Sequence, residues 1–174
     1  MGTPTEILRE EHGVILGALA LLERAAGRQE KGTPPEGWWS ELIAWLRAFA
    51  DRTHHAKEEQ FLFPAMVKAG VPSEGGPVAV MLEEHQQGRA LIAAMEAGAR
   101  EDRAARAREY VHLLRGHIDK ENGVLFPLAD AVLDEPAQRA LAREFEAVEA
   151  EQGREALIGE AERRLQRLEA VLGA

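Results

Sequence analysis

The sequence predicts an all-α protein, an antiparallel up-down-up-down four-helix bundle with an extra C-terminal helical segment. Ala, Leu, Glu and Arg, all of them acceptable or strong helix formers, dominate the 174 residues. The alternating runs of β-branched and aromatic residues that indicate strands are absent. Apolar residues instead recur at three- and four-residue spacing in four segments with short connections, a pattern typical of helices that share one core.

Capping and helix-breaking residues divide the chain into helices. Thr3-Pro4-Thr5-Glu6 has the form of a capping box with proline at the first helical position, and Thr33-Pro34-Pro35-Glu36 repeats the device. Pro77 opens a third helix, and a glycine followed by a polar cluster marks the turn into a fourth. The predicted spans are therefore 4–29, 34–68, 77–98 and about 100–132. Two internal prolines, Pro64 and Pro127, are expected to kink or end their helices nearby, because proline lacks a backbone donor.

The apolar stripe of each predicted helix includes residues expected in the core, among them Leu16 in the first helix and Val124 in the fourth. The bundle is expected over residues 1–133. The segment 134–174 begins at Asp134-Glu135-Pro136, is more charged and keeps one apolar side. We therefore expect a helical extension that packs on the bundle or on a second copy of the chain, which leaves a homodimer open.

The composition excludes several classes of function. The net charge of −9 argues against nucleic acid or an anionic membrane as the main partner. The absence of cysteine excludes disulfides, thiolate metal sites and thiol catalysis, so any metal is held by His, Asp or Glu. The polar N-terminus has no apolar signal core, and no stretch of about 18 apolar residues follows it. We therefore expect a cytoplasmic protein.

An internal duplication contains the residues with metal-binding chemistry. Glu10-Glu11-His12 opens the first half of the bundle, and Glu83-Glu84-His85 opens the second. Each half ends in a longer match, which starts at His54 in the first half and at His117 in the second, with Glu four residues later and then Leu-Phe-Pro at the same offset. The residues that recur in both halves are His12, His54, Glu58, His85, His117 and Glu121.

The match in the first half can start at His54 or at His55, because His55 is also followed by Glu four residues later. Only the His54 frame places Leu-Phe-Pro at the same offset in both halves, and only this frame lies on the core stripe. At 3.6 residues per turn, His55 points about 100° away from that stripe. His55 and His112 are therefore expected to be solvated.

The six recurring residues are expected to point into the apolar interior from four helices. Their burial without partners would cost several kcal/mol each, and a metal centre removes this conflict. His and Glu at positions i and i+4 reach the same point, and a carboxylate can bridge two cations. A core histidine or a surface helix pair explains one such pattern but not two in register. The Glu pairs before His12 and His85 are expected to be mostly exposed, with one Glu of each pair able to orient a histidine.

This pattern resembles the hemerythrin-like family, also described as the HHE cation-binding domain, over about residues 1–133. Ferritin-like di-iron bundles instead use Glu-x-x-His with extra carboxylates. The resemblance implies a bundle that holds two iron ions, a non-heme di-iron centre with an oxo or hydroxo bridge. The implied ligands are His12 and His54 for one iron, His85 and His117 for the other, and Glu58 and Glu121 as carboxylate bridges.

The sequence departs from the oxygen-carrying members of that family at one informative place. Those proteins have a further His four residues after the position of His85, and here that residue is Arg89. With two imidazoles, two bridging carboxylates and a solvent-derived bridge, each iron would keep an open position. Arg89 is expected to pair with a nearby Glu or to stabilise an anionic ligand. Tyr110 is expected to pack in the core or to donate a hydrogen bond toward the site.

Three classes of function remain. The first is a non-enzymatic di-iron protein that binds a small oxidant ligand, O₂, NO or peroxide, for sensing, storage or scavenging. The second is a di-iron oxidoreductase that acts on peroxide or nitric oxide. Repair of iron centres, linked to some similar proteins, is less favoured because those proteins usually add a cysteine-bearing N-terminal region and this chain has no cysteine. The third is an interaction bundle that the metal only stabilises.

Overall fold

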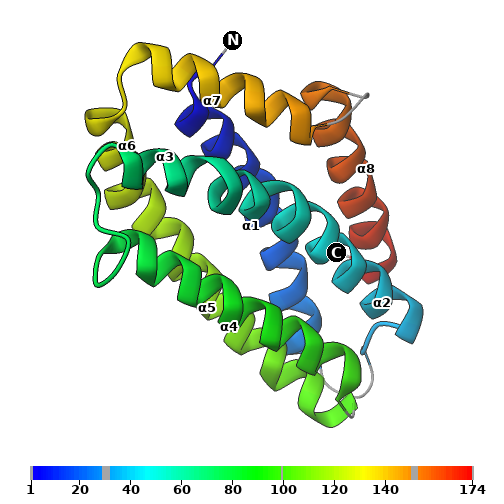
Figure 1. Cartoon of the computed structure of the whole chain (residues 1–174). Coiled ribbons are helices and arrows are strands. Elements are labelled where there is room, and N and C mark those ends of the chain that lie inside the picture. The colour runs from blue at the N-terminus through cyan, green and yellow to red at the C-terminus, as the bar shows by residue number, and fades with distance from the viewer. Residues whose placement is uncertain (1, 29–31, 99, 150–152, 174) are drawn as a thin grey trace.

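A computed structural model describes residues 2–28, 32–98, 100–149 and 153–173, and the regular elements in these ranges are all helices. Four antiparallel helical rods form a bundle (Figure 1). The first rod is α1 (Pro4–Gly27), and the third is α4 (Pro77–Ala97). The second and fourth rods include π-helical turns, denoted η. The second consists of α2 (Glu36–Trp45), η1 (Leu46–His55), η2 (Glu58–Leu62) and α3 (Phe63–Lys68), and the fourth of α5 (Arg100–Lys120), η3 (Glu121–Leu125) and α6 (Phe126–Val132).

The rods enclose one interior. α1 packs against η1 on one side and against α5 on the other, and α4 packs against α2, η1 and α5. Each rod therefore has two neighbours, as in a closed four-helix bundle. None of the described helices combines the length and the apolarity needed to cross a membrane.

The first predicted helix start is confirmed, and the second is wrong. The Thr3 side chain accepts a hydrogen bond from the Glu6 backbone, and Glu6 Oε2 accepts one from the Thr3 backbone at 2.7 Å. The second rod instead begins at Glu36, with Pro35 at the cap position and no side-chain cap bond. A residue that precedes proline is disfavoured in the α conformation, which excludes Thr33 and Pro34 from the helix. α1 ends at Gly27, and the predicted end at 29 lies outside the described residues.

The internal prolines do not end their rods. Pro64 and Pro127 each follow a π-helical turn, η2 or η3, in which the residue before the proline donates to the carbonyl of Glu58 or Glu121, five residues back. Such a turn widens the helix locally. The rod therefore continues past the proline, although proline has no backbone N–H to donate. The two predicted bridging glutamates, Glu58 and Glu121, are therefore the first residues of the π-helical turns that precede the prolines.

The C-terminal extension packs on the bundle of its own chain. α7 (Glu135–Val148) starts at Asp134, whose side chain accepts from the Ala137 backbone, as predicted. A second helix, α8 (Arg154–Leu172), follows Gly153, which has a φ of 74° that favours glycine. α7 packs against α1 and η2, and α8 packs against α1 and α2.

Tryptophan side chains join α8 to the second rod. Trp38 donates its indole N–H to the Leu168 carbonyl at 2.8 Å, and Trp45 donates to the Ala161 carbonyl at 3.0 Å. Both indoles are buried. Because a buried indole N–H needs an acceptor, these bonds fix where α8 lies on α2.

The hydrophobic core forms two clusters along the bundle. One cluster contains the tryptophans and the α8 contacts, and the other contains Phe63, Phe126 and Phe145. Two predicted core positions are wrong, since Leu16 is 39% exposed and Val124 is 59% exposed. Val124 lies in η3, where a π-helical residue turns by less than the roughly 100° of an α-helix and so leaves the core stripe.

Candidate metal centre

The six residues singled out by the duplication meet between the two hydrophobic clusters. α1 supplies His12, the second rod His54 and Glu58, α4 His85, and the fourth rod His117 and Glu121. Each is at most 1% exposed. Four elements that are distant in the sequence therefore place four imidazoles and two carboxylates at one buried location.

Each of the two carboxylates lies between histidines from both halves of the chain. Glu58 has one oxygen 3.5 Å from His54 Nε2 and the other 3.3 Å from His85 Nε2. Glu121 has one oxygen 3.1 Å from His12 Nε2 and the other 3.2 Å from His117 Nε2. This arrangement has the form that two bridging carboxylates require, one oxygen toward each of two cation positions.

The polar atoms at this location lack partners. His12 Nε2, His54 Nε2 and all four carboxylate oxygens of Glu58 and Glu121 are buried without a hydrogen bond. Each such atom costs free energy on burial, and most buried polar atoms in proteins are satisfied. A metal ion supplies the missing partner for nitrogen and oxygen donors together, so the residues present fit a metal centre.

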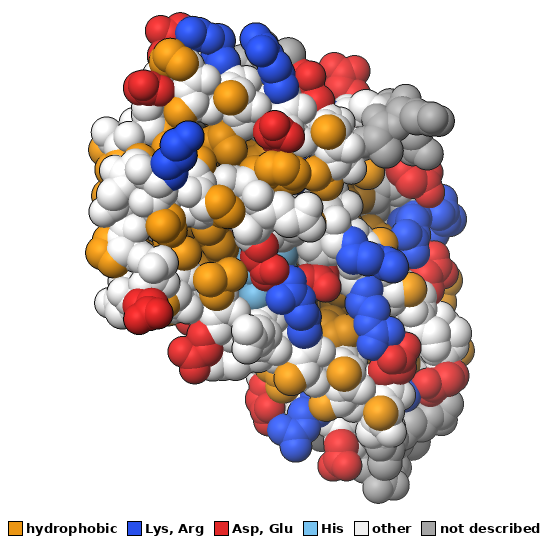
Figure 2. Space-filling view, in the orientation of Figure 1, with side chains coloured by type: hydrophobic (Ala, Val, Ile, Leu, Met, Phe, Trp, Pro, Cys, Tyr) orange, Lys and Arg blue, Asp and Glu red, His pale blue; other side chains and the backbone are white. Residues whose placement is uncertain are grey.

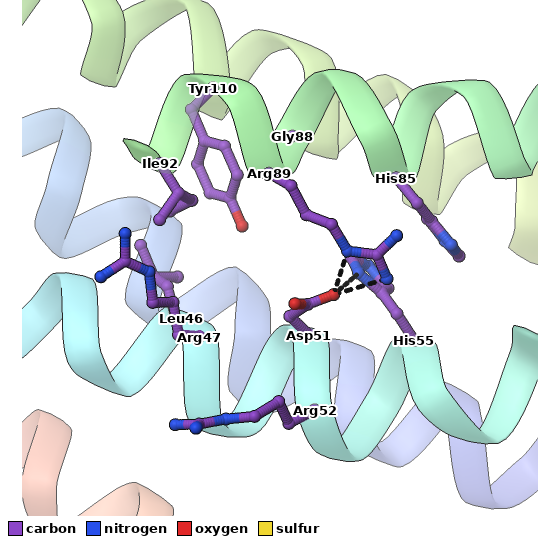
Figure 3. Close-up of a pocket in the computed structure, with 10 residues that line it drawn as sticks. All are labelled: Leu46, Arg47, Asp51, Arg52, His55, His85, Gly88, Arg89, Ile92 and Tyr110. Atoms are coloured by element: carbon purple, nitrogen blue, oxygen red, sulfur yellow. Dashed lines mark hydrogen bonds and ion pairs between the residues drawn. The ribbon is translucent and has the colours of Figure 1, made fainter. Parts of the chain in front are cut away.

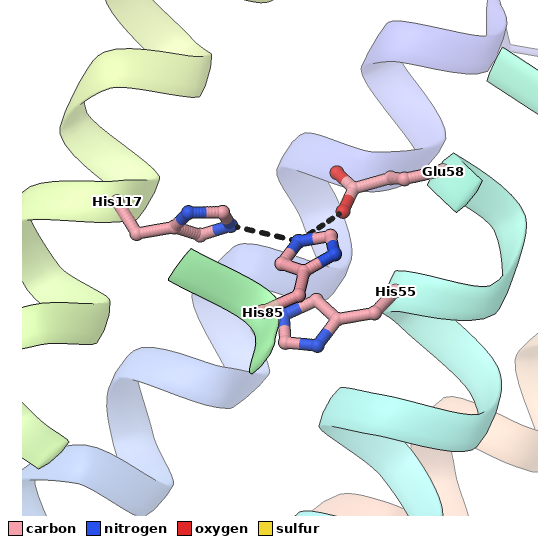
Figure 4. A group of neighbouring side chains, drawn as sticks. All are labelled: His55, Glu58, His85 and His117. Atoms are coloured by element: carbon pink, nitrogen blue, oxygen red, sulfur yellow. Dashed lines mark hydrogen bonds and ion pairs between the residues drawn. The ribbon is translucent and has the colours of Figure 1, made fainter. Parts of the chain in front are cut away.

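His55 belongs to this cluster, and the expectation that it is solvated is wrong. Its side chain is buried, and its ring stacks on His85 with centroids 3.9 Å apart (Figure 4). The expectation assumed 3.6 residues per turn, whereas His54 and His55 both lie in the π-helical η1. A π-helix turns less per residue, so both neighbours face the interior. His112 is exposed, as expected.

Two groups of possible ligands result, and we refer to the residues of both groups as the donor cluster. In each group, one ligand atom of every residue lies within 4.8 Å of the others. The first group is His55, Glu58, His85 and His117, and the second is His12, His54, Glu58 and Glu121. Glu58 is common to both groups. The internal duplication is broken here, because the position that corresponds to His55 in the second half is the buried apolar residue Ile118.

Outer carboxylates orient the histidines, and they repeat with the duplication. Glu11 accepts from His54 Nδ1 at 2.8 Å, and Glu84 accepts from His117 Nδ1 at 2.9 Å. Each of these glutamates also pairs with a lysine of the facing rod, Lys57 or Lys120. The expectation that one Glu of each pair orients a histidine agrees with these contacts, although each acts on the facing helix and Glu11 is fully buried.

The other two duplicated histidines, His12 and His85, have Nδ1 partners that sequence reasoning missed. His12 Nδ1 lies 3.0 Å from Asn122 Oδ1, and His85 Nδ1 lies 2.7 Å from Glu59 Oε1. Asn122 and Glu59 are duplicates of each other, directly after Glu121 and Glu58, and this shared position is the signal that identifies them. A hydrogen bond at Nδ1 leaves Nε2 free as a metal ligand. Nε2 of His85 and His117 then face each other at 3.1 Å, where a cation satisfies both (Figure 4).

Burial and charge set opposite protonation states for two of the histidines in the metal-free chain. Burial lowers the pKa of His54 to about 3. Burial also opposes the charge on His85, but the neighbouring carboxylates of Glu58 and Glu59 outweigh it and raise the pKa of His85 to about 9. Removal of the metal thus leaves a protonated His85 and a neutral His54 at neutral pH.

A cavity of about 250 Å³ lies beside the donor cluster (Figure 3). Its inner end is formed by His55 and His85, and Tyr110 and Arg89 lie along its sides. Arg89 donates to Asp51 at 2.8 Å and to Glu59 at 2.7 Å, which confirms that it pairs with a nearby Glu. In the space-filling view, an imidazole is visible at the bottom of a groove with acidic and basic side chains at its rim (Figure 2).

Comparison with known proteins agrees with the site. The family model described as the hemerythrin HHE cation-binding domain matches residues 3–129. The chain therefore belongs to this family.

The chain is also similar to individual proteins, over part of their length. The chain is 30% identical over 155 residues to the Mycobacterium tuberculosis protein Rv1995, which covers 83% of this chain and 60% of that protein. It is 36% identical over 121 residues to a Yersinia pestis protein named iron-sulfur cluster repair protein YtfE, which covers 62% of this chain and 52% of the relative. The chain thus spans about half to three-fifths of the length of these relatives. No solved structure matches.

Proposed function

We propose that the chain is a non-heme di-iron protein that binds a small oxidant ligand, O₂, NO or peroxide, for sensing, storage or scavenging. The observation that carries the proposal is the placement of Glu58 and Glu121, each with one oxygen toward a histidine of each half and neither oxygen hydrogen-bonded. Two carboxylates in this arrangement suit two neighbouring cations. The metal supplies redox chemistry and a position for the ligand when it is bound.

The corrected role of His55 changes where the ligand binds. The first group offers three imidazoles and the second offers two, His12 and His54. If both carboxylates are shared, the second group would supply one donor fewer, which would leave the open coordination position to its ion. Whereas the sequence alone predicts an open position on both ions, this donor set favours an asymmetric centre with one such position.

Outer hydrogen bonds prepare the four duplicated histidines for this role. Glu11, Glu59, Glu84 and Asn122 each hold one Nδ1, which fixes the ring orientation and the tautomer with Nε2 toward the centre. Lys57 and Lys120 hold two of these carboxylates in turn. The chain therefore supplies a preorganised set of donors.

The second candidate is a di-iron oxidoreductase that acts on peroxide or nitric oxide. The observation that favours it is the similarity to a relative named as an iron-sulfur cluster repair protein. This chain contains no cysteine and spans about half of that relative, so the proposal is limited to redox turnover of the small ligand.

The experiment is metal analysis of aerobically purified protein, followed by ultraviolet–visible spectra before and after anaerobic reduction and return to air. Two irons per chain with bands that bleach and return unchanged support reversible ligand binding. Two irons with irreversible oxidation and consumption of peroxide support the oxidoreductase. Metal-free or zinc-loaded protein with a normal helical fold, after growth with iron, would contradict both and leave an interaction bundle.

A further inference from the structure

The cavity beside the donor cluster is larger than a diatomic ligand requires. Its volume is about 250 Å³, whereas a cavity of about 150 Å³ in another protein accepts benzene. It therefore has room for one substituted aromatic ring. His55 and His85 of the first ligand group line it, whereas no residue of the second group does, and the open coordination position is proposed at that second group. The cavity is thus separate from the proposed position of the oxidant ligand.

The walls of the cavity suit a flat apolar body. Leu46, Ile92 and the ring of Tyr110 line it. Gly88 also lines it, and a β-carbon there would meet Tyr110 Cε2 at 3.5 Å. Glycine inside a helix is less favourable than alanine. The missing side chain leaves space beside the Tyr110 ring, and a larger residue at this position would fill that space.

Two of the three arginines that line the cavity are held by carboxylates, which disfavours an anionic occupant in the metal-loaded chain, where His85 is neutral. Arg89 is committed to Asp51 and Glu59, and Arg47 makes two hydrogen bonds to Glu96 at 2.7 and 2.6 Å. A ligand carboxylate would have to displace these partners while it approached Asp51. Arg52 extends away from the space that the other lining side chains enclose (Figure 3). A neutral occupant meets no such conflict.

One polar group in the cavity is free to select its ligand. Tyr110 is 3% exposed, and among the described residues its hydroxyl has no hydrogen-bond partner. The hydroxyl points into the cavity, toward the side of Asp51 (Figure 3). Because the rest of the Tyr110 side chain is buried, the cavity is the space from which a group that donates or accepts a hydrogen bond reaches this hydroxyl.

We propose that this cavity binds a neutral, hydroxylated single-ring aromatic compound, a phenol or a quinol, with its ring between Leu46, Ile92 and Tyr110 and its hydroxyl on the Tyr110 oxygen. The proposal goes beyond the di-iron function, because the apolar walls of the cavity and its Tyr110 hydroxyl are not part of the donor cluster. Binding is therefore expected in both the metal-loaded and the metal-free chain, and its failure would leave the metal centre untouched.

The test is calorimetric titration of the full chain in its metal-loaded form with hydroquinone, phenol and benzoate. Hydroquinone and phenol are expected to saturate one site, and benzoate is expected to bind at least tenfold more weakly. Tyr110→Phe should weaken hydroquinone binding by about three- to tenfold, the usual value of one hydrogen bond. Gly88→Leu should abolish binding, and Gln86→Ala, an exposed change on the same helix outside the cavity lining, is the matched control that should change nothing.

Three results would overturn the proposal. They are a lack of saturable binding of both neutral compounds, tighter binding of benzoate, and unchanged hydroquinone affinity in Tyr110→Phe. The Tyr110→Phe variant keeps the ring and its packing, so its melting temperature should match that of the parent chain. It therefore decides the question even where Gly88→Leu fails to fold.

Discussion

Lys57 and Glu149 form a buried ion pair, with 2.7 Å between Nζ and Oε1. Lys57 is fully buried, and its ammonium group also contacts Glu11, which accepts from His54 Nδ1. Glu149 lies at the end of α7. One ammonium group therefore connects the C-terminal extension to a histidine of the donor cluster. The extension is part of the support of the candidate metal centre as well as a cover for the bundle.

Replacement of Glu149 with Ala is expected to destabilise the chain by about 1–3 kcal/mol, because it leaves the buried Lys57 with one carboxylate in place of two. Glu146→Ala, an exposed change on the same helix, is the matched control and should stay within about 0.5 kcal/mol. Urea unfolding followed by circular dichroism measures both variants. Equal stability of the two would show that the ion pair contributes nothing net.

Removal of residues 134–174 is expected to destabilise the bundle rather than to release an independent domain. The truncation takes away the acceptors of Trp38 and Trp45 and exposes apolar surface that α8 covers. Each large side chain that loses its cover costs about 2 kcal/mol. Tryptophan emission should shift to longer wavelength, and the unfolding midpoint should fall. A truncated chain with unchanged emission and midpoint would contradict this expectation.

The fold could be predicted largely because local signals and the hydrophobic pattern agree. The Thr3 capping box, the start at Pro77 and the cap at Asp134 are short-range devices, and the structure contains all three. The pattern failed where the backbone departs from α geometry. Val124 is exposed because η3 is a π-turn, and a fixed period of 3.6 residues cannot represent such a turn.

The donor cluster also shows that a fixed helical period cannot predict residues in a π-helical turn. The duplication singled out the residues with a counterpart in the other half, and the structure brings those six together. His55 has no such counterpart, since Ile118 occupies the equivalent position, so symmetry argued against it. Its inclusion depends on η1, a tertiary and backbone feature with no signal in the sequence pattern.

His55→Ala is expected to remove the ion of the first group and to leave the other, because this change deletes one of three imidazoles there. Metal content should fall from about two ions per chain to about one. His112→Ala, an exposed histidine, is the control and should retain both ions. The metal content of the purified variants is measured by plasma emission spectrometry. Two ions per chain in His55→Ala would show that His55 packs beside the centre and is not a ligand.

Glu58→Gln is expected to lose both ions, because Glu58 is the residue common to the two groups. The substitution keeps the size of the side chain and removes the charge that two cations require. Glu83→Gln, an exposed glutamate on α4, should bind as the parent chain does. The decisive measurement is the number of ions per chain after dialysis. A Glu58→Gln chain that still holds two would exclude the bridging role.

The stability of the metal-free chain is expected to depend on pH on both sides of neutrality. The pKa of His85 is raised to about 9, so its stabilisation is complete below about 6.5 and is lost as the pH rises through 9. The pKa of His54 is lowered to about 3, so stability is lost as the pH falls from about 6.5 toward 3. Melting temperatures of chelator-treated protein should therefore fall between pH 7 and 10, whereas metal-loaded protein, with His85 neutral and coordinated, should lack this alkaline loss. An identical alkaline decline in both forms would exclude His85 as its source.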